Sequence, residues 1–281
     1  MKKISKNISG KIGQNYIECI EQVNSVTEKL NIPYLLIGAT ARDIIFEYCH
    51  NIKCPRMTMD IDIGVNIENW ASFSKLESEL ISKFEFTKEK EKQRLKFKKT
   101  FVDLVPFGLI SDENNSIIWP QNNNVMSVLG FSEVYKYSDL IILRQKPLLQ
   151  VRVPSISGLA VLKLLSWKDA FPNRRKDADD LLFIIRNFEK TIDHDLVFDK
   201  YISILEEEKF DLTNTCTRLL GKFMADICSK DAYDTLENIL AGETSDGSDF
   251  NLVFHMNNLN DNFDSILILL KKLKKGFLST E

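Results

Sequence analysis

The sequence lacks the features that mark several large protein classes. It has no overall basic excess, because the formal net charge is −3 and the pI is about 5.8. A dedicated nucleic-acid-binding domain is therefore not indicated. It contains no run of about 18 apolar residues, the length that crosses a bilayer, so no membrane partner is expected. The N-terminal MKKISKNISGKIGQNY lacks the apolar stretch of a signal peptide.

Cysteine, proline and glycine are also scarce. The five cysteines are an odd number in a chain of 281 residues, which does not fit a secreted disulfide framework, so a cytoplasmic location is expected. The segment CHNIKC, residues 49 to 54, has no second pair of ligands and is not a recognised zinc spacing. The seven prolines and eleven glycines form no linker, and no internal repeat is present.

What is present is the composition of an ordinary folded protein, with 44% hydrophobic and 27% charged residues. Apolar spacing predicts an N-terminal helix, then alternating short strands and helices, and a strand or a kinked strand pair that ends at Pro106. The predicted helices are 15–30, 41–50 with Thr40 as its cap, and 69–84. The predicted strands are 34–38, 59–65, 94–108 and several short ones within 113–152.

From Ser155 onward the pattern becomes helical, and three or four further helices are predicted across 196–275. The sequence therefore predicts an α+β domain over 1–154, with a mixed sheet and flanking helices, followed by an all-helical domain over 155–281.

Two aspartates stand out within RMTMDIDIGV, residues 56 to 65. Residues two apart on a strand point to the same face, so Asp60 and Asp62 would project side by side. Such like charges repel unless a cation lies between them. FVDLVPF supplies a third isolated acid, Asp103. Mg²⁺, or Mn²⁺, prefers such hard oxygen ligands together with substrate phosphates. The alternative is that Asp60 and Asp62 cap a strand end.

A turn precedes this strand in IGATARD, residues 37 to 43. Gly38 would follow a strand and open a helix, where free N–H groups and the helix dipole favour an anion such as a triphosphate. Ala39, Thr40 and Arg42 would then lie near the phosphates, although a plain strand-to-helix turn has the same pattern. Arg42 is either structural or reaches a phosphate.

The ordered set of these segments resembles the nucleotidyltransferases of the polymerase-β-like superfamily. IGATARDII, RMTMDIDIGV, FVDLVPFG and LAVLKLLSWKDAFPNRRKDADDL together resemble the AbiEii/AbiGii-type abortive-infection toxins, over about residues 30 to 190. That resemblance implies a nucleotidyltransferase-like fold and adds Lys163 and Asp177 to the catalytic set, with Lys163 contacting the nucleotide. The usual Gly-Ser of the superfamily is Gly38-Ala39-Thr40 here, so Thr40 would replace the serine hydroxyl.

The alternative interpretation of Lys163 is a side chain whose stem covers apolar surface. Asp177 and Asp180 would share one face of a helix. Asp177 is expected near the site, and Asp180 is expected to be structural.

The resemblance implies transfer of a nucleoside monophosphate from an NTP to an acceptor hydroxyl. The acceptor would be tRNA or protein if the chain is a toxin with an antitoxin partner. A small-molecule (antibiotic) nucleotidyltransferase and a non-catalytic nucleotide-binding relative are the alternatives. An RNA acceptor predicts a basic rim that includes Arg94, Lys96 and Lys98, whereas a small-molecule acceptor predicts an acidic pocket in the helical domain.

Overall fold

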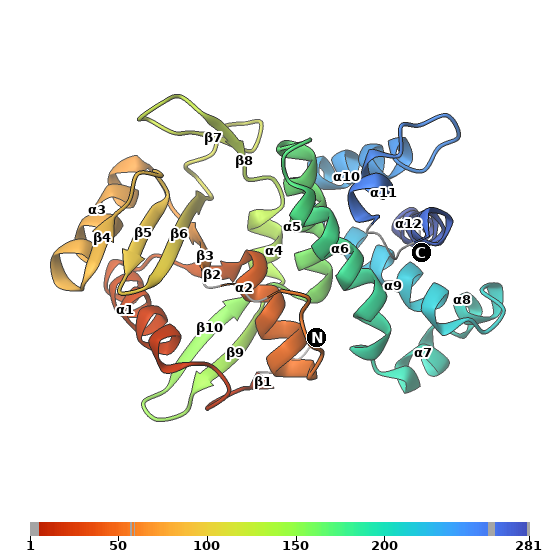
Figure 1. Cartoon of the computed structure of the whole chain (residues 1–281), viewed down its shortest axis with the longest axis horizontal. Coiled ribbons are helices and arrows are strands. Elements are labelled where there is room, and N and C mark those ends of the chain that lie inside the picture. Colours follow the sequence, from red (N-terminus) through yellow and green to blue (C-terminus); the bar gives the residue numbers. More distant parts are fainter. Residues whose placement is uncertain (1–5, 57, 59, 258–261, 280–281) are drawn as a thin grey trace. The chain divides into compact units, whose positions relative to one another are not determined.

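The computed structural model describes residues 6–56, 58, 60–257 and 262–279 (Figure 1). The chain divides into two compact units, Met1–Ser155 and Ile156–Glu281. The first combines sheets and helices, and every element of the second within the described residues is helical, so the α+β class predicted from the sequence is confirmed. No helix in the described part of the chain is long and apolar enough to cross a membrane.

The main sheet of the first unit has five strands in the order β2-β3-β6-β5-β4. Only the central pair, β3 and β6, is parallel, and the other neighbours are antiparallel. The sheet is therefore mixed. Its strands are β2 (Tyr34–Ile37), β3 (Ile61–Asn66), β6 (Thr100–Phe107), β5 (Arg94–Phe97) and β4 (Phe86–Lys88).

The two faces of this sheet differ in polarity because side chains alternate along each strand. One face carries buried apolar residues such as Ile63, Val102 and Leu95. Helices α1 (Gln14–Leu30) and α3 (Trp70–Lys83) lie beside each other next to the sheet (Figure 1). Both bury apolar stripes, as their helical spacing predicts. The other face carries the half-exposed polar residues that form the candidate site.

The rest of the first unit holds short elements. Helix α2 (Gly38–Asp43) continues directly into a π-helical segment, η1 (Ile44–Cys49). A three-stranded sheet has the order β1-β9-β10, and β7 pairs with β8. The remaining elements are β1 (Lys6–Asn7), β7 (Ser116–Ile118), β8 (Val125–Ser127), α4 (Phe131–Lys136), β9 (Asp139–Arg144) and β10 (Leu149–Val153).

Local predictions in this unit were wrong at Pro106 and after Ser127. Pro106 does not end its strand, because β6 runs on to Phe107 with Pro106 in register with Val65 of β3. A strand accommodates proline where its nitrogen is not needed as a ladder donor. Within 113–152, where short strands are predicted, Phe131–Lys136 is instead the helix α4. Gly130, with φ of 85°, turns the chain into this helix, and Val134 is its buried residue.

The second unit contains more and shorter helices than the three or four predicted for its C-terminal part. Lys209 and Phe210 both have positive φ and break the helical conformation between α8 and α9. Phe250, also with positive φ, does the same before α11. The elements are α5 (Ile156–Asp169), α6 (Arg175–Asn187), the 3-10 helix η2 (Phe188–Lys190), α7 (His194–Lys200), α8 (Ile202–Glu207), α9 (Leu212–Ala225), α10 (Lys230–Gly242), α11 (Asn251–Met256) and α12 (Phe263–Phe277).

Candidate functional site

Asp62 and Asp103 lie in one line of residues that crosses the polar face of the main sheet. The Cα of Asp62 is the register partner of Asp103 across the parallel β3–β6 pair, and Asp103 is opposite Arg94 in the antiparallel β6–β5 pair. Register partners project to the same face, and neighbouring strands are about 4.8 Å apart. The sheet therefore places two carboxylates and one guanidinium side by side on three consecutive strands.

Arg94 forms a two-point ion pair with Asp103. Its Nε lies 2.8 Å from Asp103 Oδ1, and its Nη2 lies 2.7 Å from Oδ2. The same Nη2 is 3.6 Å from Asp60 Oδ2. These contacts raise the pKa of Arg94 above its usual range, with the hydrogen bonds to Asp103 as the largest cause. The guanidinium thus supplies the positive charge between two of the three predicted metal ligands.

Asp60 precedes β3 rather than lying within it, because the strand begins at Ile61. Its backbone is fixed by Thr40, whose hydroxyl donates to the Asp60 carbonyl at 2.9 Å. Thr40 is buried and does not cap the helix, since α2 already begins at Gly38. That part of the prediction was wrong, and the hydroxyl holds the loop that carries Asp60. Its role as a phosphate ligand stays a prediction.

Gly38 brings the turn before α2 directly against the carboxylate of Asp62. Its φ is +64°, in the left-handed region that side chains with a Cβ rarely adopt. A Cβ added at this position would lie 2.1 Å from Asp62 Oδ2. The turn and the carboxylate therefore occupy adjoining space, and only glycine permits this approach.

We expect Gly38→Ala to displace the Asp62 carboxylate and to lower the free energy of unfolding by more than the roughly 1–3 kcal/mol that a strained backbone alone costs. Chemical denaturation followed by circular dichroism measures the loss. Gly10→Ala is the matched control, because Gly10 also has a positive φ, +81°, but a Cβ there meets nothing within 4 Å. Equal losses in the two variants would contradict the close approach at Asp62.

Arg42 and Ala39 lie in the same helix but face different surroundings. Arg42 is fully buried. Its Nε donates to Asp43 Oδ1 at 2.9 Å, and its Nη2 donates to the carbonyl of Arg56 at 2.7 Å. The bond to Arg56 connects α2 to the segment before Asp60. The observed contacts of Arg42 are therefore structural ones. Ala39 is partly exposed, and contact of either residue with a nucleotide stays a prediction.

Tyr16 of α1 is a neighbour of the site that the sequence did not indicate. Its hydroxyl is hydrogen-bonded to the side chain of Thr40. Burial raises the pKa of Tyr16 above its usual range, and the nearby charges of Asp62 and Asp43 raise it further. Tyr16 thus stays neutral and adds a hydroxyl to the bonds that hold Thr40. It sits at the polar start of an amphipathic helix, where nothing in the spacing marks it.

The carboxylates of this site fit a divalent cation only in part. Within the described ranges, no group of three or more His, Cys, Asp or Glu side chains is close enough together to hold a metal ion. The donor chemistry suits Mg²⁺, since Asp60 and Asp62 offer hard oxygens beside a turn that carries no Cβ. Both oxygens of Asp103 are engaged by Arg94. Asp60 and Asp62 therefore fit such an ion, and Asp103 fits it only when its ion pair opens.

Lys163 and Asp177 belong to the second unit, where they form a buried cluster of charges. Lys163 Nζ lies 2.9 Å from Asp177 Oδ1 and 2.7 Å from Asp180 Oδ2, and its side chain is 8% exposed. Arg174 Nε and Ser166 Oγ both donate to Asp177 Oδ2, at 2.7 and 3.1 Å. Lys163 is thus held by two carboxylates rather than extended along apolar surface, and its contact with a nucleotide stays a prediction.

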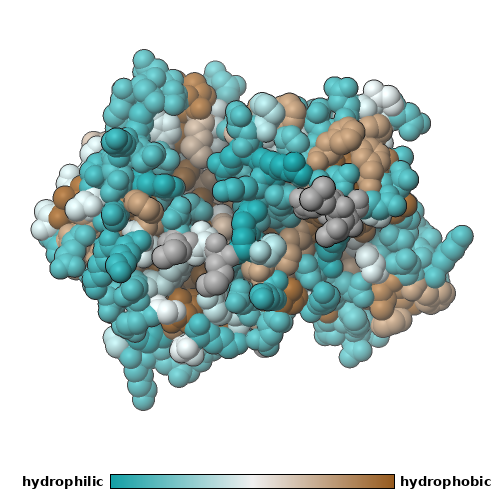
Figure 2. Space-filling model, viewed as in Figure 1, coloured by the Kyte–Doolittle hydropathy of each residue, from teal (hydrophilic) through white to brown (hydrophobic). Residues whose placement is uncertain are grey.

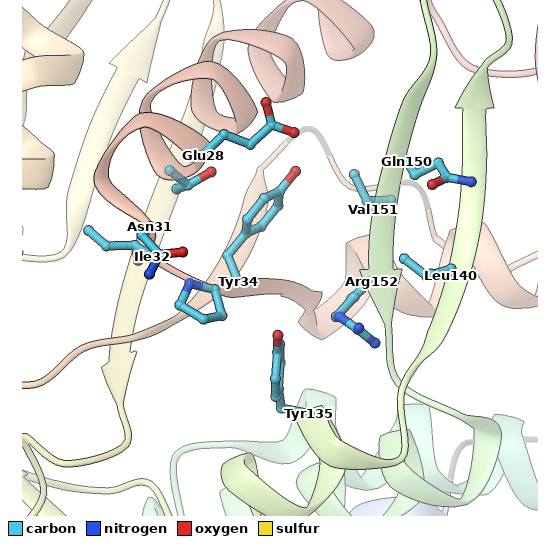
Figure 3. A pocket seen from close by; sticks show the side chains of 11 residues that line it. Glu28, Asn31, Ile32, Tyr34, Tyr135, Leu140, Gln150, Val151 and Arg152 are labelled. Atoms are coloured by element: carbon cyan, nitrogen blue, oxygen red, sulfur yellow. The ribbon is translucent and has the colours of Figure 1, made fainter. Parts of the chain in front are cut away.

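Two other surface features contain none of the predicted site residues. A cavity of about 260 Å³ in the first unit is lined by Tyr34, Tyr135 and Arg152, among others (Figure 3). The Arg152 guanidinium lies 5.2 Å from the Tyr135 ring, and its Nη1 donates to Ser138 Oγ at 3.3 Å. Figure 2 shows a largely hydrophilic surface, with hydrophobic side chains gathered over α7 and α8.

Comparison with known proteins gives only distant likenesses. No protein-family model matches the chain, and no curated protein matches it. Among solved structures, ANT(2'')-Ia in complex with adenylyl-2''-tobramycin is 12% identical, with 72% of this chain and 97% of that chain covered and a TM-score of 0.37. The Thermotoga maritima CCA-adding enzyme complexed with tRNA is 12% identical, with 95% and 82% covered and a TM-score of 0.27. At these values the likeness does not extend to an assignment of activity.

Proposed function

We propose that the protein is a metal-dependent nucleotidyltransferase, which moves a nucleoside monophosphate from an NTP to an acceptor hydroxyl. The observation that carries the proposal is the register of Asp62 with Asp103 on adjacent parallel strands, with Asp60 two residues away and the Gly38 turn in contact with Asp62. Acids gathered on one sheet face beside a glycine turn suit a phosphate-bound cation. The order of motifs that resembles the AbiEii/AbiGii-type toxins supports the same function.

In this reaction the acceptor oxygen bonds to the α-phosphorus, and the bond from that phosphorus to the bridging oxygen of the β-phosphate breaks, releasing pyrophosphate. Asp60 and Asp62 would hold the cation, whose charge stabilises the phosphoryl oxygens when it is bound. Thr40 fixes the backbone of Asp60. Asp103, once released by Arg94, would accept the proton of the attacking hydroxyl.

The charges of the second unit bear on the class of acceptor. A cavity of about 380 Å³ there is lined by Lys271, Lys274 and Lys275, together with Thr244. The antibiotic alternative predicts an acidic pocket in this unit, whereas the lining of this cavity is basic. Positive charge favours an acceptor that carries phosphates or carboxylates, so RNA or protein is the proposed acceptor class. A role as a toxin with an antitoxin partner belongs to this proposal and rests on the motif resemblance alone.

The predicted basic rim gives weaker support to an RNA acceptor. Lys98 lies in the β5–β6 turn and pairs with Glu18 of α1 at 2.7 Å. Lys96 lies 5.5 Å from the ring centre of Phe101, and Arg94 is held by Asp103. Only Lys96 of the three therefore lacks an acidic partner among the contacts observed for the rim.

A non-catalytic nucleotide-binding protein is the second candidate. The observation that favours it is the Arg94–Asp103 pair, because an arginine that permanently satisfies Asp103 would leave no acid to complete an active site. Such a protein would bind an NTP without transferring any part of it.

The test is to incubate the protein with Mg²⁺ and each α-labelled NTP, in parallel with total RNA, with protein extract and with an aminoglycoside. We expect one NTP to label RNA or protein, and expect EDTA to abolish the labelling because the carboxylates need a cation to bind phosphate. Equilibrium binding of the same NTPs is measured alongside. Tight NTP binding with no labelled product in any reaction would favour the non-catalytic alternative and overturn the enzyme proposal.

A further inference from the structure

Arg94 is restrained on three sides at the centre of the polar sheet face. Asp103 holds it through both carboxylate oxygens, Asp60 lies 3.6 Å from its Nη2, and its Cζ is 5.2 Å from the ring centre of Phe101. The side chain is only 25% exposed. Two-point pairing to a carboxylate, backed by an aromatic ring, is among the strong arrangements of arginine in proteins. The guanidinium is thus built into the site.

The guanidinium of Arg94 lies against two of the carboxylates that would hold a metal ion. Arg94 pairs with Asp103 and approaches Asp60, which are two of the three acids, although its own strand, β5, carries neither of them. A second cation within a few ångströms of the same oxygens is repelled by the guanidinium. The most exposed acid is Asp60, whose side chain is 39% exposed, against 13% for Asp103. An incoming cation therefore meets Asp60 first and Arg94 immediately behind it.

We propose that Arg94 is an internal counterion that keeps Asp103 out of the metal site until a metal-bound nucleotide arrives. This inference rests on the proposed nucleotidyltransferase function and adds a positioning residue to it. In the free protein, Arg94 pairs with Asp103 and lies near Asp60, which offsets one of the two negative charges and lowers the repulsion between carboxylates that no metal has yet offset. When the nucleotide binds, Arg94 leaves Asp103 for a phosphate, which guanidinium also binds through two points. Asp103 then becomes available to the reaction.

The chain offers a matched control for the charge of Arg94. Lys96 is the next residue on the same face of β5, and its Nζ lies 5.5 Å from the same Phe101 ring. It has no contact with Asp60 or Asp103 among the ion pairs of the described residues. Lys96→Gln therefore removes one positive charge from the same face without opening the ion pair, whereas Arg94→Gln removes the charge and opens it.

The experiment measures Mn²⁺ binding to the full chain, without nucleotide, by electron paramagnetic resonance of the free ion. We expect Arg94→Gln to bind Mn²⁺ roughly tenfold more tightly than the wild-type protein, because a competing cation has gone. Lys96→Gln should stay within about twofold of wild type, since its charge is more distant and screened. In Arg94→Gln, the KM for the NTP should also rise because the phosphate partner is lost.

Arg94→Lys is the second variant, since it keeps the charge and loses the two-point geometry. It should fold like wild type and bind Mn²⁺ with an affinity between those of wild type and Arg94→Gln. A purely structural ion pair would give variants of lower melting temperature with unchanged or weaker Mn²⁺ binding, and that result would overturn the inference. Equal tightening by Lys96→Gln would overturn it as well.

The outcomes separate this inference from the proposed function. If the wild-type protein binds Mn²⁺ and transfers nucleotide but Arg94→Gln binds no more tightly, only the role of Arg94 is wrong. If wild type and Arg94→Gln both fail to bind Mn²⁺ at millimolar concentrations and no transfer is seen, the metal-dependent function fails and the inference fails with it.

Discussion

Asp62→Asn is expected to reduce nucleotide transfer by roughly a thousandfold, the scale seen when one strong electrostatic contact to a transferring group is lost. An amide keeps the size of the side chain and removes the charge that would bind the cation. The free energy of unfolding should change by no more than about 1 kcal/mol, because the lost charge stands beside two other carboxylates that repel it. Single-turnover transfer of α-label measures the first effect, and urea denaturation measures the second.

Glu113→Gln is the control for Asp62→Asn, because Glu113 is an exposed acid in the loop after β6 and carries the same charge. It should transfer nucleotide at the wild-type rate. If Asp62→Asn transfers within tenfold of wild type, the carboxylates on this face are not the metal ligands. A large loss of stability with normal transfer would assign Asp62 a structural role instead.

The sequence predicted the strands that hold the site because their signals are local. A short apolar run that ends in glycine predicts β2 and the turn after it. Isolated acids within apolar runs predict that a cation or a polar group lies beside Asp62 and Asp103. Which of these strands pair with each other, and in which register, could not be predicted from local patterns. Parallel pairing of β3 with β6 joins segments about forty residues apart, and no local pattern fixes the register of such a pair.

The pairing of Arg94 with Asp103 was not predicted for a related reason. Arg94 stood in a run of charged residues, KEKEKQRLKFKK, that is typical of a solvated hairpin. The hairpin register puts Arg94 opposite Asp103, and one residue of slip would have turned it to the other face. Lys98 shows the same effect, because the turn redirects it to Glu18. Charge and spacing indicated a basic strand, but the β5–β6 register determines which residue each basic side chain contacts.

Lys163→Ala is expected to be the most destabilising of these substitutions, with a loss of about 3–5 kcal/mol in the free energy of unfolding at neutral pH. Removing the ammonium leaves Asp177 and Asp180 as buried carboxylates, which are 3% and 0% exposed. Arg174 still pairs with Asp177, but Asp180 loses its ion pair with Lys163, whose Nζ lies 2.7 Å from Asp180 Oδ2. Denaturation followed by far-ultraviolet circular dichroism measures the loss.

Lys168→Ala is the matched control, since Lys168 lies on the same helix, α5, and is exposed. It should cost less than about 0.5 kcal/mol. A similar small loss in Lys163→Ala would show that the buried cluster contributes little to folding. Lys163 would then be retained for another purpose, and a decrease in transfer without a decrease in stability would support the nucleotide contact implied by the motif resemblance.

The pH dependence of the same variant separates charge from packing. Burial raises the pKa of Asp177, but Lys163 and Arg174 outweigh it, so the pKa in the folded protein is below its usual value. A carboxyl whose pKa is lowered on folding stabilises the protein above its unfolded pKa of about 3.9, and that stability is lost as the pH falls further. In Lys163→Ala, the burial of the Asp177 carboxylate without the neighbouring ammonium costs less once this carboxyl is protonated. The gap between variant and wild type should therefore be widest at pH 7 and narrow toward pH 4, whereas a gap that stays constant with pH would identify a packing defect.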